Sequence, residues 1–177
     1  MLVSADTHIP FPRPLVYATY RDKLVELVSY VPDVQQIEVK SRREENNLIH
    51  LVNEWHGGGD IPFVARAIIS ESMLSWTDIA TWNESDFTTQ WHVKTHAFTE
   101  AVRCVGVHRF KEIGSGTLIE TRGELAIDTN QIEGVPQLLA GTVGRTVEDF
   151  LSNKIKPNLL QVSEGVRLYL EQSQHNS

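Results

Sequence analysis

The spacing of the apolar residues changes twice along this chain, and those changes limit the folds that it can adopt. From residue 15 to 30, and again after residue 134, apolar residues recur at the spacing of one face of an α-helix. Between residues 37 and 127 they recur mainly at every second position, as in β-strands with one buried face. A sheet with one apolar face must bury that face against another element. The sequence therefore predicts an α+β fold in which the long C-terminal helix covers a sheet.

Short turn signals between the alternating segments indicate that the strands are antiparallel. Asn46-Asn47, Asn83-Glu84-Ser85-Asp86 and Gly114-Ser115-Gly116 each separate two such segments, and these residue types favour tight turns. Strands joined by tight turns pair as antiparallel hairpins. Residues 61–73 fit a loop with a short helix. The expected strands cover residues 3–11, 48–56, 74–82, 87–95, 101–111 and 117–127, with another that begins near Ile37.

Two regions have helical spacing. Residues 15–30 predict one helix bent near Arg21–Asp22, or two short helices. The second region opens at Gly134-Val135-Pro136 and continues to about residue 171. Pro157 lies inside it and should kink the helix, because proline cannot donate a main-chain hydrogen bond and clashes with the preceding turn.

Length, charge and cysteine content exclude several classes of function. The chain has 177 residues, and we expect one domain over residues 1–172 followed by a frayed polar tail over 173–177. Its net charge of -7 argues against nucleic acid as a partner. Cys104 is the single cysteine, which excludes an intrachain disulfide and fits a reducing compartment. No signal peptide is evident and no stretch approaches the ~20 apolar residues of a membrane span, so we expect a cytoplasmic protein without stable membrane insertion.

Three segments carry a resemblance to a known superfamily. In Ile9–Tyr17 a strand runs into a helix opened by proline, in Tyr30–Val39 a short helix leads into a strand, and Gly116–Glu120 begins the last strand before the long helix. These segments and the order of elements resemble the SRPBCC superfamily, which includes START domains, Bet v 1-like proteins and polyketide cyclases. The resemblance implies a helix-grip fold, in which a curved antiparallel sheet wraps around a long C-terminal helix. It also implies a cavity for a hydrophobic small molecule or lipid between sheet and helix.

The tryptophans are the first candidates for ligand contacts. All four lie in expected strands, and Trp76 and Trp82 share one face of theirs. A large ring with one polar N–H group suits a pocket that grips an apolar ligand through a few polar contacts. The alternative is that these rings only fill the core. The four residues are Trp55, Trp76, Trp82 and Trp91.

Further candidates lie on the same strand faces and on the last helix. Asn53 shares a face with Trp55, and a buried amide needs hydrogen-bond partners, which a ligand or a neighbouring backbone group could supply. Cys104 is expected to be a small buried residue facing the same cavity. The helix would contribute the start of its apolar stripe, which consists of Leu139, Val143 and Val147.

Metal and phosphate sites are not expected. His50, His56, His92 and His96 lie on the strand faces opposite the tryptophans, and none of the usual zinc-binding spacings is present. The run Gly57-Gly58-Gly59 lacks the Lys-Ser/Thr of a phosphate-binding loop, so we interpret it as a turn. The sequence therefore predicts no metal and no cofactor.

Three functions stay open at the level of sequence. The first is binding, with or without transport, of a hydrophobic small molecule or lipid. The second is a polyketide cyclase/aromatase-like enzyme acting in the same cavity, for which Asn53 with Arg103 or His108 would be the first candidates. The third is a protein-interaction domain that uses the outer sheet face or the last helix. An oligomer is compatible with all three.

Overall fold

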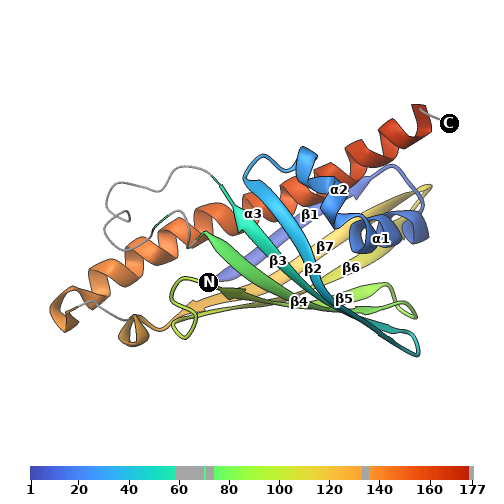
Figure 1. The fold of residues 1–177 in the computed structure, drawn as a ribbon. Helices are drawn as coiled ribbons and strands as arrows, with labels where there is room; N and C mark the ends of the chain where they lie inside the picture. Colours follow the sequence, from blue (N-terminus) through green and yellow to red (C-terminus); the bar gives the residue numbers. More distant parts are fainter. Residues whose placement is uncertain (59–69, 71–73, 133–135, 176–177) are drawn as a thin grey trace.

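The computed structural model describes residues 1–58, 70, 74–132 and 136–175. Its seven strands form one curved antiparallel sheet in the order β1-β7-β6-β5-β4-β3-β2 (Figure 1). Within the expected segment 61–73 only residue 70 is described, and residues 134 and 135, where the last helix was expected to open, lie outside the described residues. The strands are β1 (Leu2–Ile9), β2 (Val34–Glu45), β3 (Leu48–Gly57), β4 (Ser75–Asn83), β5 (Thr88–Thr95), β6 (Val102–Ile113) and β7 (Gly116–Ile127).

Two short helices follow β1, which is one of the two arrangements expected from the sequence. α1 (Arg13–Asp22) begins with proline in its first turn and ends next to Lys23, where α2 (Leu24–Leu27) starts. The 3-10 helix η1 (Val28–Tyr30) then leads into β2. Proline fits the first helical turn because the main-chain N–H there has no partner within the helix.

The last element is α3 (Gln137–His175), a helix of 39 residues that crosses one face of the sheet (Figure 1). Its residues Val147, Val162 and Val166 are buried against that face. The helix is continuous through Pro157 and extends to His175, beyond the boundary at residue 172 that the polar tail suggested. Its first turns project past the ends of the strands (Figure 1). The α+β helix-grip arrangement expected from the sequence is thus confirmed.

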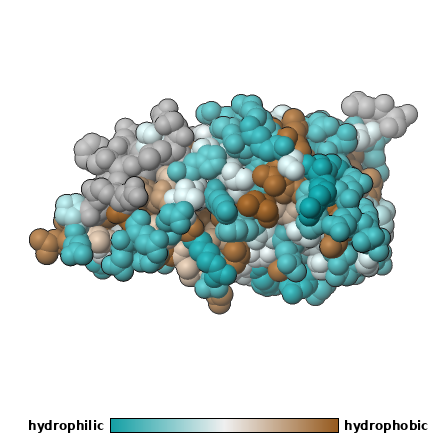
Figure 2. Space-filling view, turned by 60° about the horizontal axis from the view of Figure 1, so that its bottom comes forward, coloured by the Kyte–Doolittle hydropathy of each residue, from teal (hydrophilic) through white to brown (hydrophobic). Residues whose placement is uncertain are grey.

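The inner and outer faces of the sheet follow from strand alternation. On β7, Ile119, Thr121 and Leu125 are buried, whereas the residues between them are partly or fully exposed. β2 departs from this rule. Ile37 is 3% exposed but Val39 is 50% exposed, next to a register shift between Val39 and Ser41. This bulge redirects the side chains from Ser41 onward, whereas Val39 still pairs with Asn53 and is exposed on the edge strand of the sheet. Seen from the side of the strands, hydrophilic residues cover most of the surface (Figure 2).

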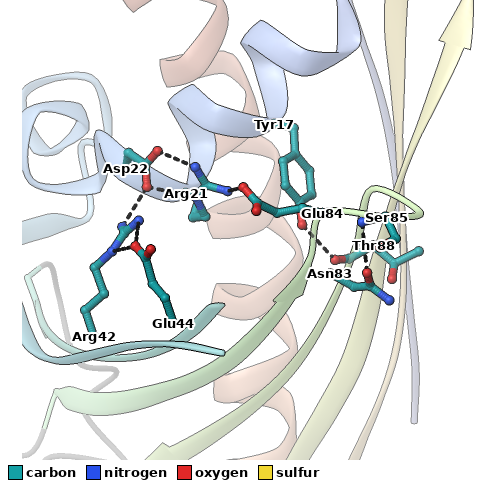
Figure 3. A network of polar contacts seen from close by, with 9 residues as sticks. All are labelled: Tyr17, Arg21, Asp22, Arg42, Glu44, Asn83, Glu84, Ser85 and Thr88. Atoms are coloured by element: carbon teal, nitrogen blue, oxygen red, sulfur yellow. Dashed lines mark hydrogen bonds and ion pairs between the residues drawn. The ribbon is translucent and has the colours of Figure 1, made fainter. Parts of the chain in front are cut away.

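A polar network fixes α1 over the ends of the neighbouring strands (Figure 3). Arg21 Nη1 lies 2.7 Å from Glu84 Oε1 in the β4–β5 turn, and the same guanidinium binds Asp22. Asp22 Oδ1 in turn accepts a hydrogen bond of 2.8 Å from Arg42 of β2. The Tyr17 hydroxyl donates to the main-chain oxygen of Thr88 at 3.2 Å. These contacts hold α1 at one end of the inner face, where Tyr20 reaches the space beneath α3.

Candidate ligand-binding cavity

A cavity of about 190 Å³ lies between the inner face of the sheet and α3. Strands β3 to β6 supply one wall and α3 supplies the other, while Tyr20 of α1 and Leu24 of α2 contribute at the side. The wall from α3 is formed mainly by Val147, Phe150, Leu151, Ile155, Leu159 and Val162. The cavity is therefore apolar on the helix side, and most of its chemistry comes from the strands.

Strand register explains which side chains reach the cavity. Residues paired across antiparallel strands point to the same face, so the lining is arranged in rows. One row pairs Trp82 with Thr89 and His108, and the next has Trp91 beside Ala80 and Gly106. The row after that contains Asn53, Asp78, Val93 and Cys104, and a further pair contains Trp55 and Trp76.

All four tryptophans line the cavity. Trp55 and Trp76 are stacked, with ring centroids 5.6 Å apart and an interplanar angle of 17°. The indole nitrogens of Trp55, Trp82 and Trp91 are buried and have no hydrogen-bond partner among the described residues. Indole N–H groups that are buried usually find an acceptor. The tryptophans therefore present apolar surface together with unsatisfied donors.

A carboxylate–amide pair lies in the middle of this aromatic surface. Asn53 is only 1% exposed, and its Nδ2 donates to Asp78 Oδ2 at 3.5 Å, whereas its Oδ1 has no partner among the described residues. Asp78 itself borders the cavity. Burial raises the pKa of Asp78 to about 6, and the hydrogen bond from Asn53 opposes that rise. Asn53 thus finds a side-chain partner, and the polar group that reaches the cavity is Asp78.

Three further titratable groups of the cavity are neutral near pH 7. Burial lowers the pKa of His108 to about 3, and its Nδ1 lies 2.8 Å from Thr121 Oγ1. Burial also raises the pKa of the Cys104 thiol to about 11. The pKa of Tyr20 is raised well above its ordinary value, again mainly by burial. None of these three side chains brings a charge to the cavity at neutral pH.

An ion pair and two glycines at the end of β3 border one part of the cavity. Lys154 Nζ of α3 lies 3.7 Å from Asp33 Oδ2, which precedes β2. Gly57 N donates to Leu74 O at 2.7 Å, and Gly58 N donates to Asp33 O at 2.9 Å. Because these N–H groups are satisfied by carbonyl oxygens, they are not free to bind phosphate. Gly57 is the last residue of β3, not part of the expected turn, and Gly58 follows it. Gly59 lies outside the described residues.

The structure brings most of the expected site residues together. Trp55, Trp76, Trp82, Trp91, Cys104 and Val147 line the cavity, and Asn53 lies directly behind it. It does not bring Leu139 or Val143 there. Leu139 is 54% exposed, because the first turns of α3 extend beyond the sheet. Among the residues considered for an enzyme, His108 lines the cavity but Arg103 is exposed on the opposite face of β6.

Sequence reasoning missed Asp78, although a signal was present. Asp78 lies between Trp76 and Trp82 at alternate positions of one strand, so it shares their face. An acidic residue on a face otherwise occupied by tryptophan and alanine is unusual, because buried carboxylates are costly. Strand parity alone therefore points to Asp78 as a cavity residue.

The outer-face histidines do not converge. His50, His56 and His92 are partly exposed and His96 is exposed. Within the ranges that the structure describes, no group of three or more His, Cys, Asp or Glu side chains could hold a metal ion. Within the same ranges, no helix has the length and apolar character needed to cross a membrane.

We compared the chain with known protein families, curated proteins and solved structures. No family model matches the sequence, and no curated protein matches it. TTHA0849 from Thermus thermophilus superimposes with a TM-score of 0.64 at 17% identity, covering 94% of this chain and 97% of the other. The Zhui aromatase/cyclase from Streptomyces sp. R1128 superimposes with a TM-score of 0.61 at 12% identity, covering 94% of this chain and 93% of the other. Norcoclaurine synthase from Thalictrum flavum superimposes with a TM-score of 0.61 at 8% identity, covering 96% of this chain and 86% of the other.

These comparisons define the class of fold. The matches extend over nearly the whole chain and include the sheet and the long helix. The chain therefore has a Bet v 1-like helix-grip fold, which is the fold that the sequence resemblance implied. Identities of this size establish the fold alone, so the function has to be argued from the cavity.

Proposed function

We propose that this protein binds a small hydrophobic molecule in the cavity beneath α3. The observation that carries the proposal is the cavity itself, which is lined mainly by apolar side chains and by all four tryptophans, Trp55, Trp76, Trp82 and Trp91. Cavities with such a lining are typical sites for small molecules. A ligand with an apolar body would fill the space and contact the indole rings.

The size of the cavity favours a small ligand. Pockets for drug-sized molecules have volumes of about 300–1,000 Å³, whereas this cavity has about 190 Å³. A compound of one or two rings suits that space better than a long-chain lipid or an extended polyketide. Within the broader expectation of a hydrophobic small molecule or lipid, we therefore favour small ring compounds.

Binding can be tested with two probes of different size, naphthol and palmitate. We expect naphthol to quench the intrinsic tryptophan fluorescence saturably and to raise the melting temperature, because it contacts the indole rings and binds only the folded state. Palmitate should do neither at equal concentration. Saturable binding of palmitate with no binding of naphthol would contradict the proposed ligand class.

A matched pair of variants locates the site. Val93 lines the cavity, so Val93→Phe should fill it and lower the affinity for naphthol at least tenfold. Val52 of β3 lies on the opposite face of the sheet, and Val52→Phe adds the same bulk outside the cavity. Undiminished binding by a folded Val93→Phe protein would place the naphthol site elsewhere.

A cyclase/aromatase-like enzyme is the second candidate function. It is favoured by His108 and Asp78, which place a neutral imidazole and a carboxyl group with a pKa of about 6 in one apolar cavity. A carboxyl group with a pKa of about 6 is suited to proton transfer near neutral pH, and a neutral imidazole can hydrogen-bond a substrate oxygen. Two proteins that share the fold are named as an aromatase/cyclase and as a synthase. The test is turnover of a small ketone that can cyclise to an aromatic ring. Loss of this turnover in His108→Gln would support the enzymatic function, and unchanged turnover in that variant would oppose it.

A further inference from the structure

Among the described residues, Asp78 has no cationic partner, unlike the other acidic residue that they contribute to the cavity. Asp33 also borders the cavity, and its carboxylate is paired with Lys154 at 3.7 Å. The only hydrogen bond to Asp78 from the described residues comes from Asn53, at 3.5 Å, and no cation among those residues shifts its pKa. The cavity therefore contains one carboxylate whose charge the described side chains leave uncompensated.

An uncompensated carboxylate in an apolar cavity is costly. Buried charges in proteins are normally paired or bind metal ions, and no metal-binding cluster is present among the described residues. At about pH 8 Asp78 is mainly ionised, because this pH lies well above its pKa of about 6. An apolar ligand that filled the cavity would exclude water from the carboxylate and increase that cost. A ligand carrying a positive charge would offset it.

The aromatic lining suits such a ligand. Trp76 and Trp82 flank Asp78 on the same face of β4, and Trp55 is stacked on Trp76. Trp91 lines the same cavity from β5. Aromatic faces attract cations, tryptophan most strongly. A carboxylate surrounded by tryptophans can therefore bind an ammonium group together with the hydrophobic body that carries it.

The other titratable groups around the cavity do not oppose a cation. Tyr20 of α1, together with Cys104 and His108 of β6, is neutral near pH 7 because of burial. Lys154 of α3 is the one lining cation among the described residues, and it is neutralised by Asp33. The net charge that the described lining presents to a ligand is therefore that of Asp78.

We propose that the ligand is an amine with a small hydrophobic, ring-containing body, and that Asp78 binds its protonated amino group. This inference rests on the proposed function, since it specifies the chemical class of the molecule held in the same cavity. The tryptophans would contact the ring, and Asn53 would hold the Asp78 carboxylate in place. No covalent step is involved.

The test compares phenethylamine with phenethyl alcohol, which share the same ring and chain length and differ in the charged group. Titrations at about pH 8, monitored by calorimetry and by tryptophan fluorescence, should show that the amine binds at least tenfold more tightly than the alcohol. In Asp78→Asn this preference should disappear through a loss of amine affinity, while the affinity for the alcohol should stay the same or increase, because the alcohol no longer desolvates a carboxylate. Asp149→Asn removes a carboxylate from the exposed side of α3 and should keep the preference.

A second readout uses the unmodified protein. Near pH 6 Asp78 is partly protonated, so an ammonium group beside it should displace a proton, whereas the alcohol should cause proton uptake by desolvating it. Calorimetry in buffers of different ionisation enthalpy measures the sign of this exchange. Equal affinities and equal proton exchange for the two probes would overturn the amine inference and leave the binding function standing. Failure of both probes and of naphthol to bind would overturn the binding function as well.

Discussion

Trp91 owes its position to two glycines in the neighbouring strands. A Cβ atom on Gly106 would lie 2.2 Å from Cζ2 of Trp91, and one on Gly123 would lie 2.8 Å from its Cη2. The indole ring thus packs directly on the backbone of β6 and β7. Glycine within a strand often marks such a close approach. The two glycines therefore set the depth of the cavity at this row.

We expect Gly106→Ala to displace Trp91 and to lower the free energy of unfolding by about 1–3 kcal/mol, the usual cost of overpacking. Urea denaturation measures this loss. Adding Trp91→Phe should recover part of it, because the smaller ring leaves room for the new methyl group. Strictly additive effects of the two substitutions would show that the clash is not with Trp91.

Asp78 should make the protein less stable as pH rises. The unfolded carboxyl group has a pKa near 3.8 and the folded one about 6, so between these values the folded protein binds the proton more strongly. The contribution of Asp78 to stability should therefore decrease from about pH 4 to about pH 7, by up to about 3 kcal/mol, while the lowered pKa of His108 acts in the opposite direction in both proteins compared below. In Asp78→Asn this decrease should be absent, and the variant should be more stable at pH 7.5 but not at pH 4. Denaturation curves of both proteins at several pH values across this range measure the difference. If the free energies of unfolding of the two proteins change with pH in parallel, Asp78 does not have a raised pKa in the folded state.

Residue types and strand parity carried much of the information about the cavity. They predicted that Trp55, Trp76, Trp82 and Trp91 share a face with Cys104, and all five line the cavity. They did not reveal that Asn53 binds Asp78, because that contact joins two strands and depends on their register. A position along one strand specifies its face, but its cross-strand neighbour is known only once the pairing is known.

At the scale of elements, α3 meets its neighbours differently along its length. Gly144 is packed against the 3-10 helix η3 (Thr129–Gln131), and a Cβ atom there would lie 1.9 Å from Thr129 Cγ2. Gly141, one turn earlier, has no atom within 4 Å of such a Cβ. The two glycines have the same helical environment but opposite tertiary environments.

These two glycines form a matched pair for substitution. Gly141→Ala should stabilise the protein by about 0.5–1 kcal/mol, because alanine favours the helix and meets nothing. Gly144→Ala should destabilise it by about 1–3 kcal/mol despite the same gain in helix propensity, because the methyl group collides with Thr129. Thermal unfolding distinguishes the two. A stabilising Gly144→Ala would mean that α3 does not pack on η3 in solution.

The extent of contact between α3 and the sheet was not predictable from the sequence. Helical spacing correctly identified one apolar stripe, and its later members Val147, Val162 and Val166 are buried. The same stripe placed Leu139 and Val143 in the cavity, where the structure does not bring them. Periodicity tells which side of a helix is apolar, but where the sheet ends beneath it depends on strand length and crossing direction.

At the scale of the whole molecule, we propose that residues 1–172 form one cooperative unit. The tryptophans lie on the sheet beneath α3, so their fluorescence reports on the sheet–helix interface, whereas circular dichroism reports mainly on the helix. For a single unit, urea denaturation followed by the two signals should give coincident curves. Loss of helical signal at lower urea than the fluorescence change would show that α3 unfolds separately.

The whole architecture was more predictable than the cavity within it. Alternation and turn signals indicated a sheet built of hairpins, and the observed neighbours β2–β3, β4–β5 and β6–β7 match them. The cavity volume was not predictable, because it is a small difference between the space enclosed by the backbone and the volume of the side chains that fill it.

The strand order also affects the synthesis of the chain. β1 and β2 are consecutive strands but form the two opposite edges of the sheet, and β1 pairs only with β7, as Val3 does with Gly123. During translation at about 5–20 residues per second, β1 therefore waits on the order of ten seconds for its partner to leave the ribosome. Its apolar side chains stay uncovered in that interval, and contacts so distant in sequence form slowly. The nascent chain should accordingly depend on chaperones more than its modest size suggests.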